Sequence, residues 1–321
     1  MADATVYGVI DQAYNSTKVT AAGATSKQTG FGAVWNGSLV GFKGSEDLGG
    51  GMKAFFQQEI GLTTDSNERT GTANGSNTIT GVATGPTNGV ENRNSFVGLS
   101  GGFGAVQIGR QYNFAFLSAI ANDPLGFSGV GGYAVGFGGP GGATRTSNMI
   151  AYTAPTLAPG LGIQVGKAMG ETVTTAAAPT KTGDSTSYGV TYAAGALYAG
   201  ITGETITATA TTKTKNSTTT ITYDLGMVKV GYGLGKTATG TDYNKGNAFS
   251  ITVPVGALTL ALSSGDQKAV VLGAAEVKTK VSQYGAHYAL SKRTTGYLQS
   301  GKQSTTTTSQ NIYAVGIKHD F

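Results

Sequence analysis

Side chains that commonly carry catalysis or bind metal are scarce in this chain. Its 321 residues include no cysteine and only two histidines, His287 and His319. The lack of cysteine excludes disulfide bonds and thiolate metal sites. A Ser–His nucleophile pair would have to use one of these two histidines. We therefore expect no enzymatic activity, no cofactor and no bound metal.

One glycine-rich segment looks like a phosphate-binding loop. Residues 231–237 read GYGLGKT, but the position where the motif needs its first glycine holds Val230. The segment also reads as the end of a strand. The glycines of residues 101–104 do not open a helix, so they form no dinucleotide fingerprint. Both nucleotide-binding hypotheses are rejected.

The charged residues are few and dispersed. The chain has 22 Lys and Arg against 17 Asp and Glu, for a net charge of +5. Only Lys292 and Arg293 are adjacent in sequence, whereas nucleic-acid binders usually cluster their basic residues. We expect no nucleic acid partner. The charged share of 12% is about half that of soluble domains.

The composition favours strands and turns over helices. Glycine accounts for 52 residues and tyrosine for 15, and threonine is abundant. No apolar run is long enough for a membrane-spanning helix. The lack of such a run does not exclude a membrane barrel, because the apolar face of a barrel is spread over alternate residues. No signal-peptide pattern precedes the first strand, and we interpret Met1 as a replacement start on a mature form.

Short alternating segments recur along the whole chain, and short turns alternate with long polar connections between them. The expected strands are residues 5–14, 39–47, 53–63, 92–100, 105–112, 148–153, 161–170, 187–192, 196–204, one ending at 223, 227–236, one ending at 255, 258–263, 280–290, 294–300 and 311–321. Sixteen strands of about 20 residues each, connections included, suit a bilayer crossing. The pattern predicts an all-β, 16-stranded antiparallel transmembrane β-barrel, with residues 1–321 as a single domain. No segment shows a convincing helical period.

The two faces of the expected strands support a membrane barrel over a soluble sandwich. In the last strand Tyr313, Val315 and Ile317 share one face, and Gly316 and Lys318 share the other. An apolar outside with a polar inside is the arrangement of a membrane barrel, whereas a soluble sandwich buries its apolar face. A barrel phospholipase would need its histidine outside, but His287 has the inward parity.

Four segments resemble the general porins of Gram-negative bacteria, especially the betaproteobacterial type. Residues 5–11 (TVYGVID) resemble their first strand, and residues 41–51 (GFKGSEDLGGG) their second. Residues 92–112, from NRNSFVGL to IGRQY, resemble their fourth and fifth strands. Residues 313–321 (YAVGIKHDF) resemble their last strand. The resemblance reaches both ends of the chain.

This resemblance implies a homotrimer in the cell outer membrane that passes small hydrophilic solutes and ions. It implies contact with outer-membrane lipid and lipopolysaccharide. It also implies recognition by the barrel-assembly machinery through the C-terminal strand, with Phe321 as the assembly signal. In such porins the third long connection, here residues 113–147, folds into the lumen and narrows it. A connection of this length is often functional.

The expected constriction combines matched family positions with strand alternation. Arg93 and Arg145 occupy the family's arginine positions, and Lys43 lies on the inward parity of its strand. Arg93 is expected to face the lumen because Phe96, on the opposite parity, is expected to face outward. The acidic side is expected to be Asp123 of the long connection and Asp11 of the first strand. These charges predict a mild anion preference or near neutrality.

Arg110 needs a separate interpretation. It shares the parity of Val106 and Ile108, which places it on the outer wall. An arginine facing lipid at the bilayer midplane would cost about 2–4 kcal/mol. We therefore expect it at the trimer contact, where the resemblance suggests an acid of the neighbouring second loop, with Glu68 as the candidate.

Two other functions are alternatives to a general porin. The first is a substrate-selective anion channel on the same barrel, for phosphate or another small anion, which more bases converging on the pore would favour. The second is a Gly/Thr-rich β-solenoid adhesin, which would show a fixed repeat period, and no such period is found.

Overall fold

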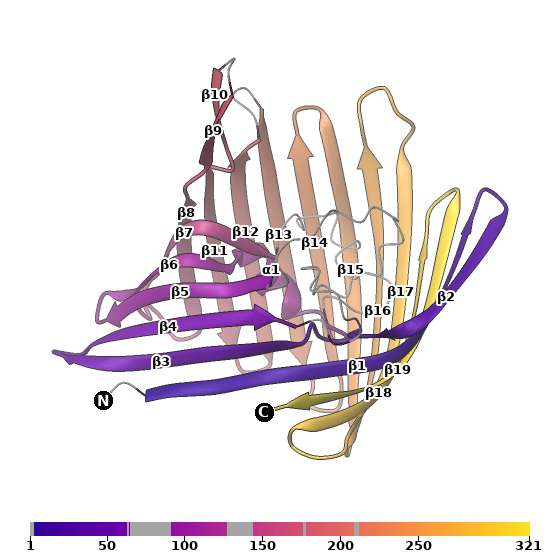
Figure 1. Cartoon of the computed structure of the whole chain (residues 1–321), viewed down its shortest axis with the longest axis horizontal. Coiled ribbons are helices and arrows are strands. Elements are labelled where there is room, and N and C mark those ends of the chain that lie inside the picture. The colour runs from indigo at the N-terminus through magenta and orange to yellow at the C-terminus, as the bar shows by residue number, and fades with distance from the viewer. Residues whose placement is uncertain (1–2, 63, 65–90, 127–143, 176–177, 209–211) are drawn as a thin grey trace.

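The computed structural model describes residues 3–62, 64, 91–126, 144–175, 178–208 and 212–321, and these are almost entirely β-strand (Figure 1). The main sheet contains β1 (Asp3–Ala21), β2 (Ala24–Gly32), β3 (Leu39–Gly49), β4 (Met52–Gly61), β5 (Glu91–Gly101), β6 (Gly104–Tyr112), β7 (Arg145–Thr153), β8 (Leu161–Ala168), β11 (Ser185–Ala194), β12 (Leu197–Thr207), β13 (Lys213–Asp224), β14 (Lys229–Thr239), β15 (Asp242–Val255), β16 (Leu258–Val270), β17 (Val277–Ala289), β18 (Thr294–Ser304) and β19 (Thr308–Asp320). A separate ribbon is formed by β9 (Glu171–Thr175) and β10 (Ala178–Thr182).

The main sheet closes into an antiparallel barrel because its first and last strands pair. β1 pairs with β3 on one side and with β19 on the other, from Val9 opposite Asp320 to Ala21 opposite Thr308. β2 pairs only with the loop end of β1, so sixteen strands make the closed wall. All sixteen predicted strands are confirmed as wall strands, in the predicted order.

The described part of the chain contains one helix that the sequence did not predict, α1 (Phe114–Ile120). Its seven residues are too few to show a helical period against a glycine-rich background. Within the described residues, no helix has the length and apolar character needed to cross a membrane.

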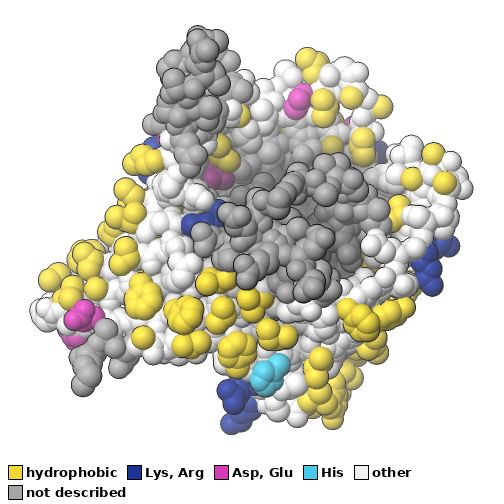
Figure 2. All heavy atoms as spheres, in the orientation of Figure 1, with side chains coloured by type: hydrophobic (Ala, Val, Ile, Leu, Met, Phe, Trp, Pro, Cys, Tyr) yellow, Lys and Arg dark blue, Asp and Glu magenta, His cyan; other side chains and the backbone are white. Residues whose placement is uncertain are grey.

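The wall is apolar outside and polar inside, as predicted. Outward side chains such as Val97 (59% exposed) and Tyr313 (59%) are uncovered, whereas inward Thr218, Thr220 and Gln283 are 1% exposed. Hydrophobic side chains gather over the outer face of β3–β6 (Figure 2). This inversion of the soluble pattern suits a wall that contacts lipid.

The C-terminal residue completes the closure at the edge of the wall. The backbone N–H and C=O of Phe321 both bond to Gly8 of β1, each at 3.0 Å. The ring of Phe321 lies where a Cβ on Gly8 would be, so any larger residue there would displace it. The terminal aromatic is therefore fitted against the first strand.

Asp11 of β1 holds a connection inside the barrel. Its Oδ2 accepts hydrogen bonds from the backbone N–H groups of Val34, Trp35 and Asn36, at 3.1, 2.7 and 2.7 Å. Its Oδ1 accepts the hydroxyl of Tyr297 at 2.6 Å. Asp11 points inward, as alternation predicted, but it is 0% exposed. The expectation that it lines the constriction is therefore corrected: its carboxylate is used to fix residues 34–36.

Replacing this carboxylate should destabilise the barrel far more than replacing a turn aspartate. Asp11→Ala removes the oxygen that accepts hydrogen bonds from three backbone N–H groups. We therefore expect a loss of about 3 kcal/mol or more in unfolding free energy. Asp224→Ala is the matched control, because its Oδ1 caps only Gly226 N–H, at 2.8 Å in an exposed turn. Urea unfolding of detergent-refolded protein measures both, and equal losses would contradict this role of Asp11.

Candidate functional site

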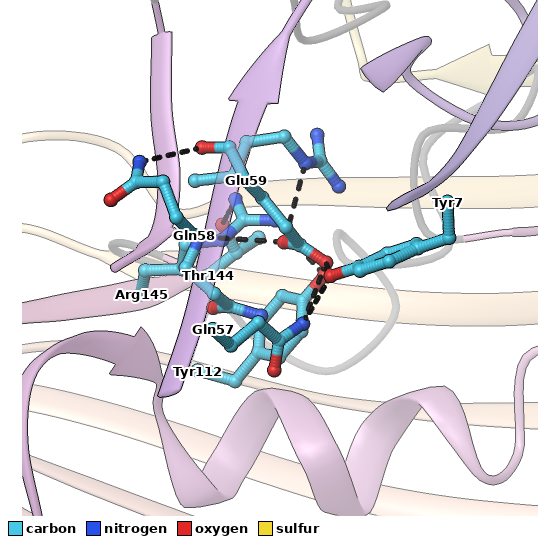
Figure 3. Close-up of polar contacts among 9 residues, drawn as sticks. Tyr7, Gln57, Gln58, Glu59, Tyr112, Thr144 and Arg145 are labelled. Carbon is cyan, nitrogen blue, oxygen red and sulfur yellow. Dashed lines mark hydrogen bonds and ion pairs between the residues drawn. The ribbon is translucent and has the colours of Figure 1, made fainter. Parts of the chain in front are cut away.

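A polar cluster covers the inner wall where β1, β3 and β4 run side by side. Tyr7 donates its hydroxyl hydrogen to Glu59 Oε1 at 3.0 Å, and Gln57 Nε2 donates to both of those oxygens, at 2.7 and 2.9 Å. The ammonium of Lys43 lies 5.0 Å from the centre of the Tyr7 ring. Figure 3 shows Tyr7, Gln57 and Glu59 converging on one point. Lys43 therefore lies beside the ring of Tyr7, whose hydroxyl is bonded to the Glu59 carboxylate.

Arg93 joins this cluster through a β-bulge. Ser95 pairs with Gln58 and Asn92 with Ile60, so Glu59 lies opposite two residues of β5. The Nε of Arg93 lies 3.9 Å from Glu59 Oε2. Without the extra residue, Arg93 would share the outward parity of Ser95. The bulge thus turns the guanidinium toward the inner carboxylate.

The reason given for this orientation from the sequence was wrong. Val97 and Leu99 are the outward residues of β5, with 59% and 50% exposure. Phe96 lies on the inner face, where its ring meets that of Phe55 at 6.3 Å edge to face. Strand alternation without knowledge of the bulge could not place both Phe96 and Arg93 correctly.

Arg145, the first residue of β7, forms a second basic position. It is 3% exposed and donates from Nη2 to the hydroxyl of Tyr112 at 3.0 Å. Its guanidinium carbon lies 4.4 Å from the Tyr112 ring centre, and Phe116 stacks on that ring at 4.8 Å. Tyr112 and Glu59 both line one cavity of about 220 Å³. Through Tyr112, Arg145 therefore lies near the cluster of Tyr7, Gln57 and Glu59.

Glu59 is the residue that the sequence reasoning missed. It is 5% exposed and accepts hydrogen bonds from Tyr7, Gln57 and the backbone N–H of Asn94. Its inward parity, shared with Gln57 in a strand that the pattern had found, was the available signal. The acid nearest to the matched arginine lies on the wall itself.

The connection after β6 continues along the opposite inner wall. Asn113 caps α1, with its side-chain oxygen accepting from Phe116 N–H at 2.6 Å. α1 packs against β11, β12 and β13. Ser118 hydrogen-bonds Thr220 of β13 at 3.0 Å, and Asn122 accepts from Ser250 of β15 at 2.7 Å. The described residues after β6 thus follow inward-facing side chains, and residues 127–143 lie outside the described part.

Glycines on the inner wall make room for this segment. A Cβ on Gly200 would meet Ser118, one on Gly231 would meet Asn122, and one on Gly285 would meet Leu125. Each glycine belongs to a different strand: β12, β14 and β17 respectively. The abundance of glycine on the wall therefore has a steric reason here.

Asp123 lies in this segment, two residues before the fully buried Leu125. Its Oδ1 accepts the N–H of Leu125 at 2.9 Å, while its buried Oδ2 has no hydrogen-bond partner among the described residues. Burial raises the pKa of Asp123 to about 7. Near neutral pH this acid therefore carries only part of a negative charge.

Of the two residues expected at a subunit contact, only Arg110 lies in the described part of the chain. Arg110 follows the exposed Ile108 on β6 and donates from Nη1 to Ser147 at 2.7 Å. Gln111, the next residue, is 2% exposed on the inner face. Glu68 lies outside the described residues.

A cysteine pair can test whether α1 lies on the inner wall. Ser118→Cys with Thr220→Cys replaces two hydroxyls that are 3.0 Å apart, so oxidation should join the thiols in most molecules. Ser118→Cys with Ile221→Cys is the control, because Ile221 faces outward with 48% exposure. The natural chain has no cysteine, so thiol titration before and after oxidation reports only the introduced pair. Equal cross-linking in both variants would contradict the placement.

Comparison with known proteins gave one match over nearly the whole chain. A family model described as Gram-negative porin matches residues 1–308. The major outer membrane protein P.IB of Neisseria meningitidis serogroup B is 40% identical over 113 residues, which cover 34% of this chain and 28% of that protein. The match thus spans less than a third of the relative's length.

Solved structures with the same architecture cover the chain completely. An anion-selective porin from Comamonas acidovorans has a TM-score of 0.82 at 24% identity, with 100% of both chains covered. OmpT of Vibrio cholerae, in a structure described as a trimer form, has a TM-score of 0.67 at 11% identity and covers 100% of this chain and 99% of its own. At these identities the likeness is one of fold.

Proposed function

Since the chain belongs to the Gram-negative porin family, we propose that it forms a general diffusion channel for small hydrophilic solutes and ions in the cell outer membrane. Porins of this family are passive channels and not enzymes. The observation that carries the proposal is the closed wall with apolar residues outside and a charged, hydrogen-bonded cluster inside. A polar inner wall is the arrangement found around a water-filled lumen.

The narrow part of the channel is assigned to residues 113–147 and the wall cluster of Tyr7, Lys43, Glu59, Arg93 and Arg145. The hydrogen bonds of Ser118 and Asn122 to β13 and β15 support this assignment, because they tie the start of the segment across the lumen. Asp11 is left out, since its carboxylate is fully engaged.

The ion preference is proposed as mildly anionic or near neutral. Lys43, Arg93 and Arg145 outnumber Glu59 in the cluster, and Asp123 is only partly ionised near neutral pH. Fixed positive charge raises the local anion concentration, and screening over about 8 Å confines the effect to the constriction. The anion-selective neighbour has the same fold, which is compatible with this proposal.

A homotrimer is proposed as the working form. A fold relative has been solved in a trimer form, and Arg110 on the outer wall offers a polar contact. Glu68 of an adjacent subunit remains the proposed counter-ion. The C-terminal strand ending in Phe321 is proposed as the signal read by the barrel-assembly machinery.

Refolded protein can test the channel directly. We expect a heat-sensitive trimer on a gel and, in planar bilayers, a conductance that rises in proportion to salt concentration. Inorganic phosphate should not block chloride current, because a general channel holds no tight phosphate site. Saturating current with phosphate block would favour the substrate-selective alternative, and an absence of conductance by the folded trimer would refute the proposal.

The contribution of Glu59 to ion preference can be measured by reversal potential in a salt gradient. Glu59→Gln removes the negative charge beside Arg93 while it retains a hydrogen-bond acceptor. We expect the chloride-to-potassium permeability ratio to rise about twofold. Glu46→Gln on the exposed turn end of β3 is the matched control and should leave the ratio unchanged. An unchanged ratio for Glu59→Gln would exclude Glu59 from the constriction.

A further inference from the structure

A row of lysines crosses four adjacent strands on the outer wall. Lys236 of β14 pairs with Lys245 of β15, Lys245 with Lys268 of β16, and Lys268 with Lys278 of β17. Like charges directly opposite each other destabilise a sheet. Four in an unbroken row therefore indicate a counter-charge that acts on this face.

The row is on the lipid-facing side of the wall. Its residues share the parity of Leu234, Phe249 and Tyr284, which are 47%, 39% and 54% exposed. Lys236 is separated from Leu234 by one inward residue. The row therefore borders the apolar band, which is the set of exposed apolar side chains on the outer wall. The strands alternate in direction around the wall, so all four lysines lie at the end of the barrel from which the long connections after β4 and β6 leave. In bacterial barrels the long connections are at the outer end.

The chain itself neutralises only half of the row. Glu276 bonds Lys268 through Oε2 and lies 3.6 Å from Lys278 through Oε1. Among the described residues, no carboxylate comes within ion-pair distance of Lys236 or Lys245. Both ammonium groups instead lie near the Tyr243 ring, at 5.7 and 5.9 Å from its centre. Two cations thus face the outside unbalanced.

The lysines surround a groove large enough for a phosphorylated sugar. Its volume is about 550 Å³, and it is lined by the four lysines of the row together with Lys280 and Asp266. Leu234 and Gly235 form part of its floor. A ligand here would meet several ammonium groups, the carboxylate of Asp266 and the apolar side chain of Leu234.

We propose that this lysine row binds the phosphate groups of lipopolysaccharide, the anionic glycolipid of the outer leaflet, with its acyl chains lying on the apolar band. The assignment uses the outer-membrane location and does not depend on which ions the channel passes. It gives the expected lipid contact a defined position. Lysines near an anionic lipid surface each contribute appreciable attraction.

The position of the row favours lipid over an adjacent subunit as the occupant. Along the sheet order β6–β7–β8–β11–β12–β13–β14–β15–β16, β16 is eight strands from β6, half of the sixteen-stranded wall. Figure 1 shows β14–β17 across the barrel from β4–β6. If Arg110 of β6 is at the subunit contact, the row faces away from it. The apolar band beneath the row also has no use in binding a soluble anion.

The test uses refolded full-length protein and a neutralising double variant. Lys236→Gln with Lys245→Gln should weaken lipopolysaccharide binding by about tenfold or more. Lys292→Gln with Arg293→Gln removes the same charge at the turn end of the barrel and should bind like the parent. A heat-sensitive trimer and unchanged conductance in the row variant show that it is folded and that the channel proposal stands independently.

Three ligands distinguish the possible sources of anion. Intact lipopolysaccharide should raise the thermal midpoint of the parent, whereas dephosphorylated lipopolysaccharide and inorganic phosphate at equal phosphate concentration should not. Full binding of the dephosphorylated lipid would overturn the role of phosphate. A comparable shift with inorganic phosphate would indicate a soluble-anion site instead, and equal binding by the row variant would remove the lysines from the site.

Discussion

The structure depends on the need to pair every backbone polar group of a sheet that lies in lipid. Hydrocarbon offers no hydrogen-bond partners, so an open sheet edge cannot be tolerated there. The thirteen residue pairs between β1 and β19 remove that edge. The reciprocal bonds of Phe321 with Gly8 extend the closure to the last residue. Pairing between the two terminal strands therefore satisfies the backbone groups that an open edge would expose.

Closure also decides what fills the interior. Once most apolar side chains face lipid, the inner wall carries mainly polar and small residues, and its buried apolar contacts are confined to small clusters such as that of Phe114 with Met149. Residues 34–36 are held on the inner side of the wall by Asp11 of β1. The described residues after β6 are held there by Thr220 of β13 and Ser250 of β15. Glycines such as Gly200 and Gly231 provide the clearance. The described parts of both connections are therefore attached to inward-facing side chains of the wall.

Regular features of this fold could be predicted from the sequence, and local irregularities could not. Alternation found all sixteen wall strands and the face of Tyr313, because a period of two persists over a whole strand. It misplaced Phe96 because one extra residue in β5 changes the parity on its far side. It placed Asp11 inward but could not show that residues 34–36 would occupy its oxygens. Glu59 was overlooked, although its parity marked it, because no motif pointed to it.

The net charge of the chain is a poor guide to what the channel passes. Of the bases behind the net charge of +5, Lys236 and Lys245 stand on the outer face, with the wall between them and the lumen. Charges more than about one Debye length away, about 8 Å at physiological salt, act weakly on an ion in water. In the proposed channel, selectivity would then depend on Lys43, Arg93 and Arg145 against Glu59, whereas the outer lysines would act on the membrane. One set of bases would thus act on ions in the lumen, and the other on anionic lipid outside the wall.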